Sequence, residues 1–103
     1  MIKSLLKWKE FGDSDAPSIT SGFSDIPDPN KDAIVKYLKN GNTILVSTGV
    51  GIDVFINEIV DNHYYLMTDG EYTWNNMIAY YVEKYNLKMP DDFINKVLES
   101  QRV

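Results

Sequence analysis

The stretch YYLMTDGEYTWNNMIAYYVEKYNLKMPDDFINKVL, residues 64–98, decides the fold. Residues 63–67 favour a strand, the sequence TDGE at 68–71 is typical of a tight turn, and residues 72–74 favour a returning strand. Two amphipathic stretches follow, separated by Pro90. The pattern predicts a β-hairpin that leads into two helices, with aromatic side chains available to close a core.

The two helices expected over residues 75–101 have clear end signals. Asn75 or Asn76 can begin the first helix, because an asparagine side chain accepts hydrogen bonds from first-turn amides. Pro90 suits the start of the second helix, where Asp91 and Asp92 complement the helix dipole. The apolar stripes at helical spacing are Ile78, Tyr81, Val82 and Tyr85 in the first helix and Phe93, Ile94, Val97 and Leu98 in the second.

Upstream, residues 29–40 form a further predicted helix. Asp28 can cap it, Pro29 suits its first position, and Gly41 can end it in the left-handed conformation. Residues 1–28 are expected to be irregular, since residues 12–28 are rich in glycine, serine, aspartate and proline. Residues 1–11 fit either a short strand or one helical turn, and we favour an extended segment.

The middle of the chain is predicted to be mostly β-structure. Residues 43–48, TILVST, are expected to form a buried strand because they are β-branched and apolar. Residues 52–60 fit both a helical stripe and strand alternation, and local pattern leaves the two open. A turn around Asn57 and the β-branched content favour strands. The whole chain, residues 1–103, is therefore expected to be a single α+β domain. In it, a small, mostly antiparallel meander over residues 43–74 is packed by about three helices.

Charge and composition limit the class of partner. The chain has a net charge of −5 and no cysteine, and neither lysine nor arginine occurs between Gly41 and Glu83. This acidic middle segment disfavours nucleic acid and suits a basic protein partner. The apolar run near the N-terminus is too short for a signal peptide, and no stretch is long enough to cross a membrane. These features predict a cytoplasmic protein without a membrane partner.

Several motifs together resemble a family of small bacterial proteins of unassigned function. They are TDG at 68–70 with Trp74, AYYV at 79–82 with Tyr85, and MP at 89–90 with Phe93, preceded by DAPSI at 15–19, Gly49 and DV at 53–54. The family pattern is TDG-x-W-x-W-P, then YYV-x-x-Y, then LP-x-x-F, and this chain departs from it at Tyr72, Asn75 and Met89. The resemblance implies a turn and strand after Asp53. It carries no known catalytic residues.

No catalytic group, metal site or cofactor is predicted. His63 is the only histidine, so it has no second histidine or cysteine to share a metal ion. The glycine-bearing run at 47–51 lacks the lysine of a phosphate-binding loop, and no Gly-x-Ser-x-Gly nucleophile motif occurs. The sequence therefore favours a non-enzymatic protein and leaves an enzyme open.

Two functional hypotheses follow. The first is an acidic protein-interaction module that binds a basic partner, as an inhibitor or immunity protein binds a toxin, and that could also form a homodimer through its aromatic side chains. Its candidate binding residues are Tyr64, Tyr72, Trp74, Tyr80, Asp53, Asp69 and Glu71. The alternative is a small-ligand-binding protein or enzyme with a pocket between the sheet and the 12–28 loop. That pocket would be lined by Asp15, Ser18, Asp53 and Asp69.

Overall fold

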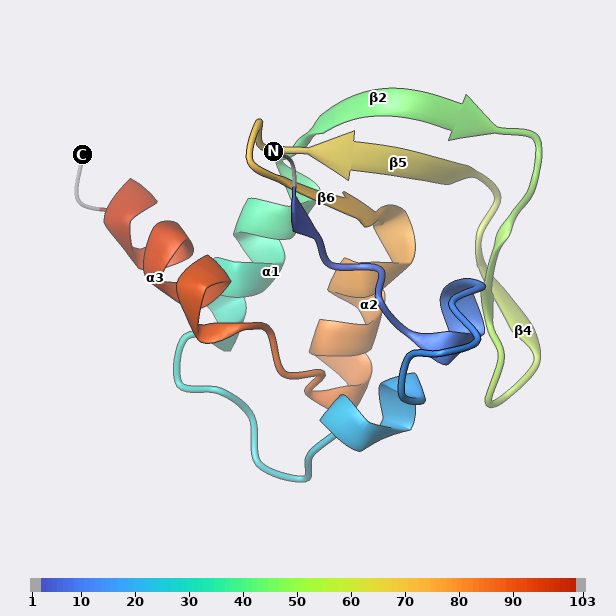
Figure 1. The fold of residues 1–103 in the computed structure, drawn as a ribbon, viewed down its shortest axis with the longest axis horizontal. Coiled ribbons are helices and arrows are strands. Elements are labelled where there is room, and N and C mark those ends of the chain that lie inside the picture. The colour runs from blue at the N-terminus through green and yellow to red at the C-terminus, as the bar shows by residue number, and fades with distance from the viewer. Residues whose placement is uncertain (1–2, 102–103) are drawn as a thin grey trace.

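Two β-sheets and three α-helices make up residues 3–101, the part of the chain that this computed structural model describes (Figure 1). The helices are α1 (Lys31–Lys39), α2 (Asn76–Tyr85) and α3 (Asp91–Ser100). The strands are β1 (Lys3–Ser4), β2 (Asn42–Ser47), β3 (Gly51–Asp53), β4 (Glu58–Asp61), β5 (Tyr64–Thr68) and β6 (Tyr72–Asn75). Short 3₁₀ helices cover Lys9–Phe11 and Ile19–Gly22. This arrangement confirms the predicted α+β class.

The larger sheet has the strand order β1-β6-β5-β2. The hairpin β5–β6 forms where the turn sequence predicted it, and β2 pairs antiparallel with β5. Between β2 and β5 the chain leaves this sheet to form the separate two-stranded sheet β3–β4. The region predicted as one meander is thus mostly antiparallel but divides into two sheets. β1 also joins the larger sheet, parallel to β6.

Residues 52–60 form the two strands and the turn of a hairpin, as the β-branched content favoured, with the turn at residues 54–57. Ile52 pairs with Ile59, and Asp53 pairs with Glu58, across an antiparallel hairpin. Asn57 lies in the turn with φ of 55°, in the left-handed region that asparagine tolerates better than most residues. The helical reading of this segment is therefore wrong.

The main core lies where the three helices meet the larger sheet. Trp74, Phe93, Ile34 and Leu38 are fully or almost fully buried there. The Trp74 indole donates a hydrogen bond of 3.0 Å to the Leu38 carbonyl oxygen, so the largest ring of the core has its polar atom satisfied. Phe93 packs against Trp74 with ring centroids 5.8 Å apart. The rings of β6 and α3 thus close the interior, as the sequence predicted.

The role of Gly41 differs from the prediction. It follows α1, but the glycines with positive φ among the described residues are Gly12 and Gly70. A Cβ atom at Gly41 would lie 2.5 Å from Cζ2 of Trp74. Glycine is required here by close packing of the backbone against the tryptophan, and not by a left-handed helix end.

The helix starts agree with the sequence in one case and differ in another. The Asn75 side chain accepts hydrogen bonds from the amides of Met77 and Ile78, which confirms it as the cap of α2. Asp28 does not cap α1, which begins at Lys31. The Asp28 carboxylate instead accepts a 2.7 Å hydrogen bond from the Asn30 amide and closes a turn before the helix.

The burial of β2 is contrary to expectation. All six of its residues are exposed, so the prediction of a buried strand over residues 43–48 is wrong in that respect. β2 forms an edge of the larger sheet, with β5 on one side only (Figure 1). Successive side chains of a strand point to opposite faces, so the exposure of Ile44, Leu45 and Val46 shows that neither face of β2 is covered.

Candidate functional site

Exposed apolar side chains are concentrated on β2 and in the segment that forms the β3–β4 hairpin. Eleven large hydrophobic side chains are exposed among the described residues, and ten of them lie between residues 44 and 60. We call these ten the apolar surface: Ile44, Leu45, Val46, Val50, Ile52, Val54, Phe55, Ile56, Ile59 and Val60. The remaining one, Ile26, lies in the 12–28 loop. Clustering of this kind marks a contact surface more often than scattered apolar residues do.

The charges within this surface are acidic. Glu58 and Asp61 lie on β4, Glu58 exposed and Asp61 half-buried. His63 follows β4, and its side chain is 71% exposed, with Nδ1 3.9 Å from an Asp61 carboxylate oxygen. Among residues 3–101, the Asp61 carboxylate is the acidic group paired with His63, and at 3.9 Å it is too far for the hydrogen bond that orients a general base.

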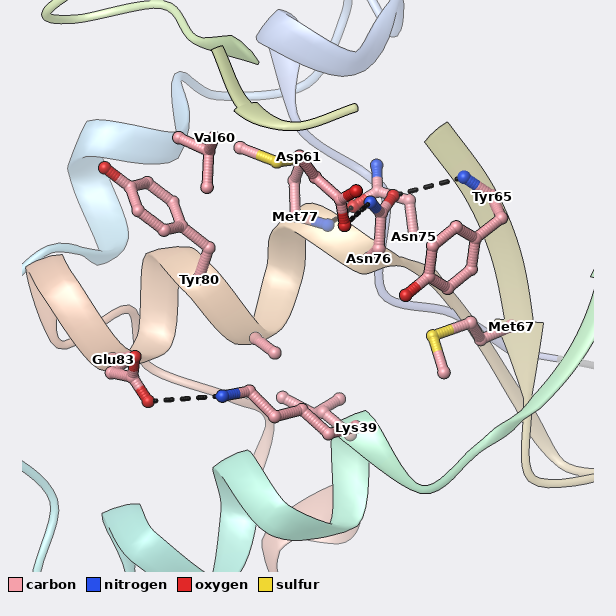
Figure 2. A pocket seen from close by; sticks show the side chains of 12 residues that line it. Lys39, Val60, Asp61, Tyr65, Met67, Asn75, Asn76, Met77, Tyr80 and Glu83 are labelled. Carbon is pink, nitrogen blue, oxygen red and sulfur yellow. Dashed lines mark hydrogen bonds and ion pairs between the residues drawn. The ribbon is translucent and has the colours of Figure 1, made fainter. Parts of the chain in front are cut away.

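A cavity of about 430 Å³ opens beside the apolar surface (Figure 2). Tyr65 and Met67 of β5 line one side of it, and Met77 and Tyr80 of α2 line another. Val60 of β4, a member of the apolar surface, also lines it. Val46 of β2 pairs with Tyr65, and paired residues share a face, so the Val46 side chain lies on the same side of the sheet as this cavity.

Polar side chains frame the cavity. Asn76 donates hydrogen bonds of 2.9 Å to Asp61 and 2.8 Å to the His63 carbonyl oxygen, and its own oxygen accepts a bond of 3.2 Å from the Tyr65 amide. Asn76 thereby ties the start of α2 to both β4 and β5. At the other end, Lys39 and Glu83 form an exposed ion pair of 3.5 Å between α1 and α2 (Figure 2).

The position of the β3–β4 hairpin depends on Asp53, whose side chain is fully buried. One carboxylate oxygen accepts hydrogen bonds of 2.6 Å from both the Tyr80 and Tyr85 hydroxyls on α2. The other accepts from the amides of Phe55 and Ile56 in the hairpin turn, at 2.9 and 3.4 Å. Lys84 Nζ lies 3.7 Å from the carboxylate. Because a two-stranded hairpin alone is marginally stable, these bonds give it a fixed place on α2.

The ionised state of Asp53 is the stable one. Burial raises the pKa of a carboxyl group, but the hydrogen bonds from Tyr80, Tyr85 and the hairpin amides more than offset this and hold the pKa of Asp53 below its ordinary value. The same bond, with burial, raises the pKa of Tyr85 to about 12, so its hydroxyl stays a donor at neutral pH. Aromatic packing also holds the hairpin on α2. The rings of Phe23 and Tyr85 stack with centroids 4.6 Å apart, and the centroids of Phe23 and Phe55 lie 5.4 Å apart.

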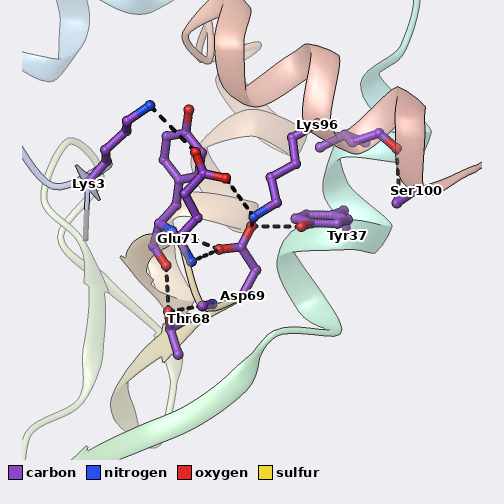
Figure 3. Close-up of polar contacts among 10 residues, drawn as sticks. Lys3, Tyr37, Thr68, Asp69, Glu71, Lys96 and Ser100 are labelled. Carbon is purple, nitrogen blue, oxygen red and sulfur yellow. Dashed lines mark hydrogen bonds and ion pairs between the residues drawn. The ribbon is translucent and has the colours of Figure 1, made fainter. Parts of the chain in front are cut away.

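A second carboxylate, that of the half-buried Asp69, organises the β5–β6 turn (Figure 3). Asp69 accepts hydrogen bonds from the Tyr37 hydroxyl at 2.6 Å and from the Glu71 and Tyr72 amides at 2.9 and 2.7 Å. Lys96 of α3 lies 3.1 Å from Asp69 and 3.0 Å from Glu71. Burial opposes ionisation, yet these donors lower the pKa of Asp69 to about 2. The network joins the turn to α1 and α3.

The structure separates the candidate binding residues by burial. Trp74, Tyr72 and Asp53 are buried and offer no surface to a partner. The two rings belong to the core, and the Asp53 carboxylate holds the β3–β4 hairpin on α2. Tyr64 and Tyr80 are half-buried, and their hydroxyls bond to Asn75 and Asp53. Asp69 and Glu71 are half-buried and paired with Lys96. Of these residues, Tyr80 lines the cavity of about 430 Å³.

The predicted pocket between the sheet and the 12–28 loop does not form from the residues named for it. Asp53 and Asp69 belong to separate networks, Ser18 donates to Glu10 within the N-terminal segment, and Asp15 is exposed. A shallow hollow does border the loop at Phe23 and Asp25, but it lies against the end of α2. The four side chains therefore do not converge.

The apolar surface itself was missed by sequence reasoning. The candidate binding residues named from the sequence are aromatic or acidic, whereas the exposed apolar side chains are mainly aliphatic. The available signal is the run of apolar residues without lysine or arginine, of which residues 43–48 favoured a buried strand.

Within residues 3–101, no three histidine, cysteine, aspartate or glutamate side chains come together in a way that could hold a metal ion. Over the same residues, none of the helices combines the length and apolar character needed to cross a membrane. No protein-family model matches the chain, and neither a curated protein nor a solved structure matches it.

Proposed function

We propose that this protein is a non-enzymatic interaction module that binds a basic protein through its apolar surface. The observation that carries the proposal is the concentration of exposed large apolar side chains in one stretch, with ten of eleven between residues 44 and 60. Covering such side chains on binding removes apolar area from water, which is the main favourable term in protein association.

The charge pattern supports a basic partner. The apolar surface lies within the segment that has neither lysine nor arginine, and Glu58 and Asp61 lie on the same hairpin. Acidic groups at the rim of an apolar patch steer a positively charged partner and disfavour acidic ones. An inhibitor or immunity protein that covers a basic toxin has this chemistry, and we propose it as the class of activity.

The framework of the hairpin also supports binding without large rearrangement. Asp53 and the stacked Phe23 and Tyr85 rings fix the β3–β4 hairpin on α2. A surface held in place before binding loses little conformational freedom when a partner docks, which favours affinity.

The test compares three tagged chains as baits in a lysate of the native host. Wild type is compared with Ile59→Lys, which places a cation on the apolar surface, and with Ile26→Lys, which makes the same change at an exposed site outside it. We expect wild type and Ile26→Lys to retain one protein of basic isoelectric point, and Ile59→Lys to lose it by at least tenfold. Equal retention by all three chains, or an acidic partner, would contradict the proposal.

A further inference from the structure

We infer that the cavity of about 430 Å³ between α2, β4 and β5 receives an arginine side chain of the basic partner. This inference rests on the proposed function and deepens it by naming the group that anchors the complex. The volume of the cavity lies within the range of pockets that enclose small molecules, so a long side chain and its adjoining backbone can enter.

The walls of the cavity match the two parts of an arginine side chain. Met67, Met77 and Val60 supply apolar contacts for the methylene stem. The half-buried Tyr65 ring projects into the cavity from β5, where a guanidinium group can stack on it (Figure 2). Arginine with an aromatic neighbour is a frequent anchor at protein interfaces.

Asp61 supplies the negative charge. Its two oxygens accept hydrogen bonds from Asn76 Nδ2 at 2.9 Å and from the His63 amide at 3.0 Å, and both donors are neutral. The side chain of Asp61 is 36% exposed, and each carboxylate oxygen can accept a second hydrogen bond. The carboxylate is thus held in orientation by the protein, with acceptor capacity left for the fork of a guanidinium group.

The Lys39–Glu83 ion pair, at the opposite end of the cavity from Asp61, also affects how strongly the cavity binds a cation. Glu83 adds a carboxylate to the cavity wall, but Lys39 lies 3.5 Å from it and also lines the cavity. An incoming cation meets Lys39 as a like charge and competes with it for Glu83. Removing the charge of Lys39 should therefore strengthen binding, whereas removing that of Asp61 or Glu83 should weaken it.

The experiment uses Nα-acetyl-arginine amide as the probe and Nα-acetyl-citrulline amide as its uncharged counterpart of similar shape. Binding to the full chain is followed by NMR at the Met67, Met77 and Ala79 methyl groups. We expect saturable shifts with a Kd on the order of 1 mM for the arginine probe, a usual strength for a ligand of its size, and at least tenfold weaker binding of the citrulline probe.

The variants supply the sharper test. Asp61→Asn and Glu83→Gln should each weaken the arginine probe several-fold, and Lys39→Gln should strengthen it. Glu99→Gln, at an exposed position on α3 outside the cavity, should leave binding unchanged. If Asp61→Asn unfolds, the variants of the exposed Lys39 and Glu83 still test the inference, because they should change binding of the arginine probe in opposite directions. Three results would overturn the inference. They are the absence of methyl shifts at a probe concentration about ten times the expected Kd, equal binding of the citrulline probe, and weaker binding of the arginine probe to Lys39→Gln than to wild type. If Asp61→Asn still captures the basic partner undiminished while Ile59→Lys loses it, the anchor is wrong and the proposed function stands.

Discussion

Replacing Asp53 by asparagine should loosen the β3–β4 hairpin and lower the stability of the whole domain. The substitution keeps the shape of the side chain but removes the charge that accepts 2.6 Å hydrogen bonds from Tyr80 and Tyr85. A hydrogen bond to a charged group contributes roughly 1.5–3 kcal/mol, and the amide group of asparagine retains part of the bonding. We therefore expect a loss of about 2–3 kcal/mol in the free energy of unfolding, or roughly 10–15 °C in Tm for a domain of this size.

The assay combines urea unfolding with hydrogen exchange. Besides the global loss, the amides of Phe55 and Ile56 should exchange faster in Asp53→Asn, because their acceptor is the Asp53 carboxylate. Tyr85→Phe should cost about 1.5 kcal/mol, and the double variant should cost less than the sum, since the two residues share one bond. The matched control is Glu58→Gln, an exposed acidic residue of the same hairpin, which should stay within about 0.5 kcal/mol of wild type.

Two results would refute this reasoning. One is an Asp53→Asn variant as stable as Glu58→Gln with unchanged exchange at Phe55 and Ile56. The other is full additivity of Asp53→Asn and Tyr85→Phe, which would mean that the two side chains do not interact.

Three further outcomes are expected. Asp69, with a folded pKa of about 2 against an ordinary 3.8, should contribute about 2 kcal/mol of stability that is fully present above the unfolded pKa and is lost as the pH falls from about 4 to about 2. Urea unfolding across that range checks this. Asp69→Asn should reduce the pH dependence by about that amount and leave the part that comes from Asp53, whose pKa is also lowered. Gly41→Ala should cost about 1–3 kcal/mol in thermal unfolding because its methyl group meets Trp74, whereas Gly49→Ala, whose Cβ would have an ordinary 3.6 Å contact, should cost little. Leu45→Lys, at a site 62% exposed, should change the unfolding free energy by about 0.5 kcal/mol or less and raise solubility in ammonium sulfate; a large loss of stability would show that β2 is covered.

The parts of the fold that the sequence predicts are those with strong local signals. The TDGE turn, the Asn75 cap and the stripes of α2 and α3 act over a few residues each, and the structure has all of them. The pairing of β1 with β6 joins residues 69 positions apart and leaves no local trace. Such a pairing depends on the assembled core and not on the pattern of Lys3 and Ser4.

The candidate site was less predictable for a related reason. Residues 43–48 have the composition of a buried strand, but composition does not reveal that β2 lies at the edge of the sheet with all six of its residues exposed. Asp53 appeared as one of several acidic residues, whereas its burial depends on hydroxyls from Tyr80 and Tyr85, 27 and 32 positions away. Gly41 similarly faces a tryptophan from a distant strand.

Solvent accessibility of the apolar surface, measured free and in complex, tests the central claim most directly. A soluble paramagnetic probe broadens the NMR signals of exposed methyl groups. We expect it to broaden those of Ile44, Leu45, Val46 and Ile59 in the free protein and to leave them sharp once the basic partner is bound, while Ile26 stays broadened in both states. Methyl signals of the apolar surface that are already sharp in the free protein, or that remain broadened in the complex, would contradict the account.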